Sequence, residues 1–387
     1  MVRETTDKKQ FSLMLCIAFC IYMATQMIGT TIATYADSMG ASAQYIGIIT
    51  GSFGLMALLP RPVAGQIVDK EDNRLLMFVV LLFCVVSSGI LLFAKAPFLL
   101  LVSRAVYGLG WGLGSTLCLT NACNTLSEKD MMKGISVYTL AQTLAMVLGP
   151  SAALFIRRLG GYFTLYLVCT ALMLAALAFA CVFRPANRGN KELRYSVNLR
   201  EMFAPEVLAP AVLSACSSVI YSATVAFVLL YAADRGVEDI NWFFTLEALM
   251  ILAFRPLVSR FVTEKNLVKV TVGSNVLYAV YLVVVTLAYS KAMFAAAAVL
   301  MGISMAASQP AIFNLCVAAV GPERRGRATN TNYAATDVGS FLGPWLTGLL
   351  VGSLGYRGIF LMMLVPLGVG LGVFVLHYRG KKQDVKV

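Results

Sequence analysis

The stretch AQTLAMVLGP (141–150) carries a Gly-Pro pair inside an apolar run, and this pair, Gly149-Pro150, recurs 194 positions later as Gly343-Pro344. Other features recur in the same order and at the same spacing. They are Arg61-Pro62 with Arg255-Pro256, Gly108 with Gly302, and Gly161-Tyr162 with Gly355-Tyr356. Two copies of such a unit fill the 387-residue chain, so the sequence predicts two parallel structural repeats.

Composition places both repeats in a membrane. Hydrophobic residues make up 59% of the chain, charged residues make up 13%, and the mean hydropathy is +0.78. A soluble domain carries about 25% charged residues. A helix that crosses the bilayer needs roughly 20 apolar residues, and the apolar runs predict twelve such helices. Their expected spans are 11–35, 43–69, 74–94, 97–124, 131–157, 161–184, 207–232, 239–262, 267–289, 292–320, 327–352 and 356–378.

The expected fold class is an all-α membrane protein, with twelve transmembrane helices in two six-helix bundles related by a pseudo-twofold axis. We expect residues 1–184 to form the N-terminal bundle and residues 206–387 to form the C-terminal bundle. The polar stretch PANRGNKELRYSVNLR (185–200) separates the repeats and predicts a cytoplasmic linker over 185–205.

Basic residues indicate the orientation, because Lys and Arg near helix ends stay in the cytoplasm. With the N-terminus inside, most of the 31 Lys and Arg residues fall on inner segments. The outer segments hold only Lys95, Arg157, Arg158, Arg235, Lys291 and Arg357. An even number of helices then places both termini in the cytoplasm. The net charge of +12 follows from this topology, and we expect no nucleic-acid partner.

Several chemistries lack the residues that they need. His377 is the single histidine, which excludes a His-based metal cluster, and the nine Cys residues form no C-x-x-C pair. No G-x-x-x-x-G-K-[ST] phosphate loop occurs, which argues against ATP-driven transport. We expect no metal, no cofactor and no catalytic residues, and therefore no enzyme.

Charged residues inside the predicted helices are the main functional signal, since each costs about 2.5–3.5 kcal/mol on insertion scales. The acids are Glu247 and Asp337, which have no counterpart in the first repeat, and the cations are Arg61, Arg104 and Arg255. Burial favours a neutral carboxyl group and a nearby Arg favours the charged form, so such a site can bind and release a proton.

We therefore predict that Glu247 and Asp337 couple transport to protons. A structural ion pair between Glu247 and Arg255 is the alternative for Glu247, and a packing hydrogen bond is the alternative for Asp337. Arg61 and Arg255 recur in both repeats, which favours a scaffold or gating role for them.

Three motifs resemble those of the major facilitator superfamily. Gly65-Gln-Ile-Val-Asp69-Lys70-Glu-Asp-Asn-Arg74 resembles the family's signature between helices 2 and 3, although Asp72 and Asn73 stand where the family prefers Gly and a basic residue. Leu101-Val-Ser-Arg104-Ala-Val-Tyr-Gly108-Leu-Gly110 resembles the helix-4 signature of proton-coupled members. Gly149-Pro150 resembles the helix-5 signature of drug-exporting antiporters, but Ala153-Leu154 replace its two glycines.

The resemblance implies roles for these residues. Arg104 would tune the coupling carboxyl groups, and Asp69 would hold the cytoplasmic side closed near Arg327 and Ala328. Proline removes a backbone hydrogen bond from a helix and permits a bend, so the Gly-Pro pairs would act as hinges or tight seams, with a static kink as the alternative. The gating candidates are Asp69, Arg74, Arg61, Arg255, Gly149, Pro150, Gly343 and Pro344.

Polar and aromatic residues near the middle of the predicted helices are candidates for lining a substrate cavity. They are Gln26, Gln142, Tyr221, Trp242 and Gln309. We expect Trp242 to lie beside Glu247 on the predicted helix 239–262.

The expected function is alternating-access transport of a small molecule across the plasma membrane of a prokaryote, as a multi-pass monomer in the lipid bilayer. The favoured form is proton-coupled export of amphipathic or cationic compounds. The alternative is transport of a small organic anion with an intramembrane Arg as its counter-ion. A channel is disfavoured by the repeats, and a membrane enzyme is disfavoured because no nucleophile–base pair is visible.

Overall fold

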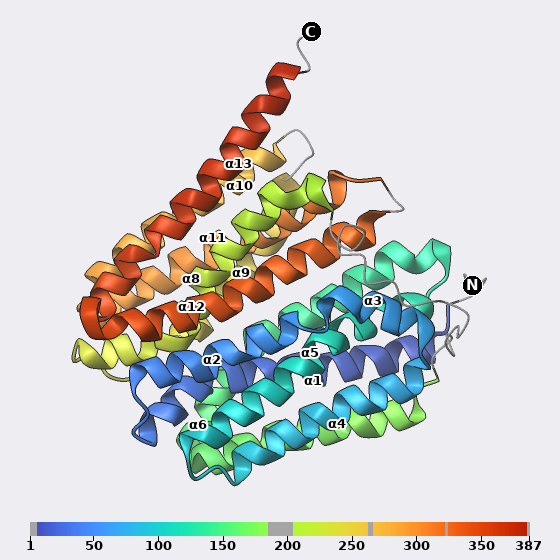
Figure 1. Cartoon of the computed structure of the whole chain (residues 1–387), viewed down its shortest axis with the longest axis horizontal. Helices are drawn as coiled ribbons and strands as arrows, with labels where there is room; N and C mark the ends of the chain where they lie inside the picture. Colours follow the sequence, from blue (N-terminus) through green and yellow to red (C-terminus); the bar gives the residue numbers. More distant parts are fainter. Residues whose placement is uncertain (1–5, 185–203, 262–265, 322–323, 385–387) are drawn as a thin grey trace. The chain divides into compact units, whose positions relative to one another are not determined.

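The computed structural model describes residues 6–184, 204–261, 266–321 and 324–384, and these ranges are almost entirely helical (Figure 1). Most of the predicted linker 185–205 lies outside the described residues. In chain order the elements are α1 (Lys8–Ser38), α2 (Ala43–Leu58), α3 (Arg61–Lys70), α4 (Asn73–Leu92), α5 (Pro97–Asn124), η1 (Glu128–Asp130), α6 (Met131–Val182), η2 (Pro205–Val207), α8 (Leu208–Asp234), α9 (Phe243–Phe261), α10 (Leu267–Leu287), α11 (Lys291–Ala318), α12 (Arg325–Met362) and α13 (Leu364–Asp384).

Within these ranges, nine helical segments are long and apolar enough to cross a membrane. Two of them, Lys133–Val182 and Arg327–Arg379, have 50 and 53 residues. One crossing needs roughly 20 residues, and each of these two segments covers two of the predicted spans. The predicted span 239–262 corresponds to α9, which carries Glu247 and Arg255. Each predicted span therefore lies mostly on helix, although 43–69 is divided between α2 and α3 and α9 begins only at Phe243, and the expected all-α membrane fold is confirmed.

Two glycines mark the points where the long helices turn. Gly161 in α6 has φ 74° and ψ −170°, and Gly355 in α12 has φ 65° and ψ 169°. This backbone region is open almost only to glycine. The two glycines are 194 positions apart, so the repeat seen in the sequence reappears as a backbone conformation.

Contacts between residues divide the chain into two compact units. Unit 1 contains residues 1–40 and 55–197, and unit 2 contains residues 41–54 and 198–387. In unit 1, α1 packs along α6 and α4 packs along α5; in unit 2, α8 packs along α12 and α10 packs along α11. Helix α2 is shared between the units, because its residues up to Gly54 belong to unit 2. The domain boundaries drawn from the sequence remain a prediction.

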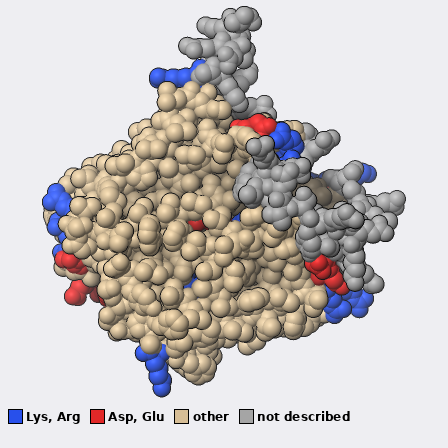
Figure 2. All heavy atoms as spheres, viewed as in Figure 1, with Lys and Arg blue, Asp and Glu red and all other residues tan. Residues whose placement is uncertain are grey.

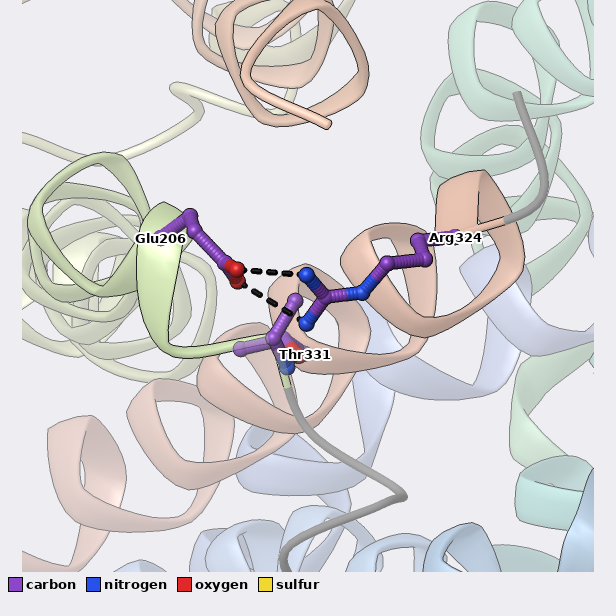
Figure 3. A network of polar contacts seen from close by, with 4 residues as sticks. Glu206, Arg324 and Thr331 are labelled. Carbon is purple, nitrogen blue, oxygen red and sulfur yellow. Dashed lines mark hydrogen bonds and ion pairs between the residues drawn. The ribbon is translucent and has the colours of Figure 1, made fainter. Parts of the chain in front are cut away.

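Polar contacts fix the start of unit 2. Nη1 and Nη2 of Arg324 donate to Oε1 and Oε2 of Glu206 at 2.6 and 3.2 Å (Figure 3). In addition, the backbone N–H of Ala204 donates to Oγ1 of Thr331 at 3.0 Å. The chain that leads into α8 is thereby attached to the first turns of α12.

Unit 1 begins in a similar way. The hydroxyl of Thr6 donates to the carboxylate of Asp130, and the backbone N–H of Ser127 donates back to Oγ1 of Thr6 at 3.0 Å. Ser127 also donates to Asp130 through its own hydroxyl at 3.0 Å. These bonds hold the chain that leads into α1 against the start of α6.

The exposed surface is largely apolar, as expected for a protein that faces lipid. The face drawn in Figure 2 consists almost wholly of uncharged residues, and the Lys, Arg, Asp and Glu side chains lie mainly toward its margins. Exposed large apolar side chains include Leu75, Phe83, Phe155 and Val369. Such extensive apolar exposure is typical of a surface that meets a membrane or a partner rather than water.

Candidate functional site

Glu247 is the most deeply buried acid among the described residues of unit 2. It lies on α9 with 4% of its surface exposed, and its Oε1 atom has no hydrogen-bond partner among the described residues. Gly302 of α11 lies against the α9 backbone here, because a Cβ at this position would lie 2.5 Å from the backbone oxygen of Glu247. Helix α11 therefore approaches α9 closely at residue 247.

The structure records no ion pair between Glu247 and Arg255, both of which it describes. Arg255 lies two turns further along α9 and is partly buried. Two ionisable side chains of α10, Tyr278 and Tyr281, lie close enough to Glu247 to be affected by its charge. Glu247 thus lies among phenol groups in an apolar interior, where a carboxyl group can be held neutral and release its proton when its surroundings change.

Tyr278 and Tyr281 belong to a polar face of α10 that the sequence analysis missed. The residues of this face recur with helical periodicity; they are Thr271, Ser274, Asn275, Tyr278 and Tyr281. Asn275 accepts a hydrogen bond from Ser217 of α8 at 3.1 Å and donates one to Ser308 of α11 at 3.0 Å. This polar face could have been recognised in the sequence, because small polar residues and Tyr recur at helical spacing within an otherwise apolar helix.

Asp337, the second predicted coupling acid, lies on α12 with 6% of its surface exposed. Its backbone oxygen faces Gly54 of α2, where a Cβ would lie 2.7 Å away. Asp337 therefore lies where α12 packs closely against α2. Glu247 lies on a different helix of unit 2, α9.

Arg104, the third coupling candidate, lies in unit 1. It is buried on α5 beside the hydroxyls of Tyr107 and Tyr166. Tyr107 shares a hydrogen bond with Thr25 at 2.7 Å, which ties this polar cluster to α1. The cluster gives unit 1 a buried cation set among phenol groups, as Glu247 is a buried acid set among phenol groups in unit 2.

Arg61 begins α3 and is 2% exposed. Its Nη1 donates to Oγ of Ser115 at 3.0 Å and to Oγ1 of Thr116 at 3.3 Å. These contacts connect α3 to α5 within unit 1, which is compatible with the scaffold role expected for this residue.

The loop between α3 and α4 contains the other charged gating candidates. Asp72 accepts a hydrogen bond from the backbone N–H of Arg74 at 2.8 Å and so caps α4. The Arg74 guanidinium donates to the backbone oxygen of Cys181 at 3.1 Å. Asn73 is buried and donates to Asn121 of α5 at 3.1 Å. Asp69 lies in α3, and its side chain is outside the described part of the chain.

The two Gly-Pro pairs lie within helices, as expected, and both glycines lie at close helix contacts. Beside Pro150 in α6, a Cβ at Gly149 would lie 2.6 Å from Cβ of Gln26 on α1. Beside Pro344 in α12, a Cβ at Gly343 would overlap the backbone oxygen of Val219 on α8.

The predicted lining residues are spread over both units. In unit 1, Gln142 donates to the Tyr22 hydroxyl. In unit 2, Tyr221 lies on α8 near Tyr278, and Gln309 is exposed on α11. Trp242 lies in the turn before α9 rather than on it, because the helix begins at Phe243.

Among the described residues, no group of three or more His, Cys, Asp or Glu side chains could hold a metal ion. Buried side chains in the described ranges carry carboxyl, phenol, guanidinium, hydroxyl, amide and thiol groups.

Two curated relatives resemble the chain over most of its length. The Staphylopine export protein of Staphylococcus aureus (strain Mu50 / ATCC 700699) is 21% identical over 359 residues, which is 89% of this chain and 90% of the relative. The Quinolone resistance protein NorA of Staphylococcus aureus (strain MSSA476) is 22% identical over 353 residues, covering 88% of this chain and 90% of the relative.

The fold resembles that of a POT family transporter solved in complex with 5-aminolevulinic acid. The TM-score is 0.80 at 12% identity, covering 98% of this chain and 97% of the solved chain. The family model described as Major Facilitator Superfamily matches residues 14–239 and again residues 211–386. The two matches overlap and together leave little of the chain unmatched, so the protein belongs to the Major Facilitator Superfamily.

Proposed function

We propose that the protein is a secondary active transporter that exports amphipathic or cationic small molecules in exchange for protons. The relatives named for staphylopine export and quinolone resistance support export as the direction. In this proposal the protein is a monomer in the plasma membrane of a prokaryote. Both termini lie in the cytoplasm, which is the orientation that the distribution of Lys and Arg favours.

The observation that carries the proposal is the buried carboxyl group of Glu247. An acid in a membrane helix costs about 2.5–3.5 kcal/mol on insertion scales, and this one has an oxygen without a hydrogen bond. A purely structural acid would recover part of that cost through an ion pair or a full set of hydrogen bonds. The arrangement is suited to a group that changes protonation during a cycle.

The other candidate residues take supporting roles in this proposal. Asp337 is a second coupling acid, and Arg104 tunes the protonation of a coupling carboxyl group. The gating candidates Asp69, Arg74, Arg61 and Arg255 and the Gly-Pro pairs control access. Gln26, Gln142, Tyr221, Trp242 and Gln309 contact the substrate.

The test is uphill transport by purified protein in lipid vesicles with an imposed pH gradient, using ethidium and a fluorescent quinolone as probes. Glu247→Gln mimics the protonated acid, so it should abolish accumulation driven by the gradient while exchange of probe for probe survives. Asp337→Asn gives the parallel test on α12. Glu238→Gln, in the exposed loop before α9, is the matched control and should behave like the wild type.

If Glu247→Gln and Asp337→Asn both accumulate the probes at the wild-type rate, neither acid carries the coupled proton. If the wild type itself shows no accumulation with either probe while it does accumulate an organic anion, the substrate class is wrong.

A further inference from the structure

Two buried polar atoms near each other in unit 2 have no hydrogen-bond partner in the part of the chain that the structure describes. One is Oε1 of Glu247 on α9, and the other is the hydroxyl of Tyr278 on α10, a residue only 2% exposed. A buried polar group without a hydrogen bond is unfavourable, because it has lost its contacts with water and gained none in return. Most such groups in proteins are paired, so two of them in one region call for an explanation.

Helix α11 brings the two residues into one cluster. Its Gly302 lies against the backbone of Glu247, and two residues later the Ser304 hydroxyl donates to the backbone oxygen of Ser274 at 2.7 Å. Ser274 is one turn before Tyr278 on α10. The charge of Glu247 also acts on the Tyr278 hydroxyl.

The neighbouring tyrosine provides the contrast. The ring of Tyr281 stacks on that of Tyr278 with centroids 5.5 Å apart, but its hydroxyl shares a hydrogen bond with Thr224 of α8 at 2.8 Å. Tyr281 is therefore held in place by α8. Tyr278 keeps a donor that it can give to another group.

We propose that Tyr278 is the positioning residue for Glu247, donating a hydrogen bond to its carboxylate in the ionised state of the transport cycle and releasing it when the carboxyl group is protonated. This inference rests on the proposed role of Glu247 as the proton carrier. The phenol keeps its own proton throughout, and the proton that moves is the one on the carboxyl group.

Physical chemistry gives the direction of the switch. A hydrogen bond to an ionised carboxylate is roughly twice as strong as one between neutral groups. Ionisation of Glu247 therefore draws Tyr278 toward it and joins α9 to α10, and protonation weakens that link. The ionisable groups around this pair are Tyr281 on α10 and Tyr221 on α8, while α11 presents Gly302.

The experiment is an infrared pH titration of the purified protein in phosphatidylcholine vesicles. The carboxyl band that Glu247→Gln removes is assigned to Glu247. Tyr278→Phe deletes only the donor, so it should move the titration midpoint of this band to higher pH by about one unit. Tyr281→Phe, whose hydroxyl is bonded to Thr224 instead, is the matched control and should leave the midpoint nearly unchanged.

An unshifted midpoint in Tyr278→Phe, or an equal shift in both Tyr variants, would overturn the inference. So would the absence of any titrating band that depends on Glu247. The transport assay of Glu247→Gln is read separately. If that variant still drives uphill transport while the band shifts as expected, the proposed coupling role fails, whereas the hydrogen bond between Tyr278 and Glu247 stands.

Discussion

Asp130 and Arg324 occupy equivalent positions in the two repeats, 194 residues apart, and carry opposite charges. Each one nevertheless holds the chain that enters the first helix of its unit, Asp130 through Thr6 and Arg324 through Glu206. The repeats have kept the contact while its chemistry has changed.

The Asp130 contact should be sensitive to pH. Hydrogen bonds from Thr6, and then from Ser127, lower the pKa of Asp130 below its ordinary value of 3.8. A folded-state pKa below the unfolded value means that the stabilisation is fully present above pH 3.8 and is lost as the pH falls through the lowered pKa. Asp130→Asn should therefore lower the melting temperature at neutral pH, and the difference from the wild type should shrink in acid.

Thr6 supplies the control for this prediction. Thr6→Val removes the donor and should lower the melting temperature in the same way, whereas Thr6→Ser keeps the hydroxyl and should not. Thermal melts of the three variants in detergent across a pH series check the prediction. A deficit in Asp130→Asn that stays constant into acid would show that the carboxylate charge is not what stabilises this contact.

Single functional residues could be predicted from the sequence where placing the side chain inside a membrane helix has a large free-energy cost. Glu247 and Asp337 stood out because charges inside apolar helices are costly, and both are buried in the structure. Tyr278 was not singled out, because a tyrosine carries no such cost and its role depends on which helices pack beside it. The pairing of Asn73 with Asn121 likewise depends on a tertiary contact. The Asp72 cap of α4 is a local contact with the backbone N–H of Arg74. The sequence had marked both positions as unusual.

At the scale of elements, the contact between α2 and α12 depends on the absence of side chains. A Cβ at Gly54 would lie 2.6 Å from the backbone nitrogen of Phe341 and 2.7 Å from the backbone oxygen of Asp337. Both atoms belong to the α12 backbone, which cannot move aside as a flexible side chain can. Small residues at such contacts allow membrane helices to pack backbone to backbone.

Gly54→Ala should therefore destabilise the protein by about 1–3 kcal/mol, the usual cost of overpacking. Gly89 on α4 has nothing within 4 Å of its added Cβ. Gly89→Ala should be neutral or slightly stabilising, since Ala is the better helix former by about 1 kcal/mol. The melting temperatures of the two variants check this prediction. An equal change in melting temperature in both would contradict the close approach of α2 and α12.

The turn in α12 should depend on backbone conformation alone. Gly355 has φ 65°, and no atom lies within 4 Å of a Cβ added there. Gly355→Ala should cost about 1–3 kcal/mol because a side chain disfavours this conformation. Gly352, one turn earlier, is helical and equally open. Gly352→Ala should not destabilise the protein. Chemical or thermal unfolding of the two variants checks the prediction, and equal stability of Gly355→Ala and Gly352→Ala would contradict the need for glycine at the turn.

Most elements could be predicted because a membrane helix is a long apolar run with polar breaks. The sequence predicted breaks between residues 157 and 161 and between residues 352 and 356. The structure turns within a few residues of both, at Gly161 and Gly355. The break between α2 and α3 at Pro60 was missed, because a proline can also lie inside a helix, as Pro150 does. The division of α2 between two units depends on long-range contacts that no local pattern contains.

At the scale of the whole molecule, the family and the fold class predicted from the repeats and motifs are confirmed by the family match and the helical architecture. The family motif is complete at Asp69 but departs from the family pattern at Asp72 and Asn73. The gating role of Asp69 remains a prediction from that motif.

Asp69→Asn should shift the population toward the inward-open state, because the carboxylate that holds the cytoplasmic side closed is lost. Accessibility labelling of single cysteines in a background without the nine native Cys residues measures this shift. Asp72→Asn serves as the control, since Asp72 caps α4. Labelling in Asp69→Asn that matches the wild type on both faces would contradict the gating role.

The central claim is that movement of an exported compound is tied to movement of protons. The most direct measurement records the internal pH of vesicles that contain the purified protein and a trapped pH-sensitive dye, while an ethidium or quinolone gradient drives transport. The account predicts that protons move opposite to the compound in the wild type and that this proton movement disappears in Glu247→Gln. Transport of the compound by the wild type with no change in internal pH would contradict it.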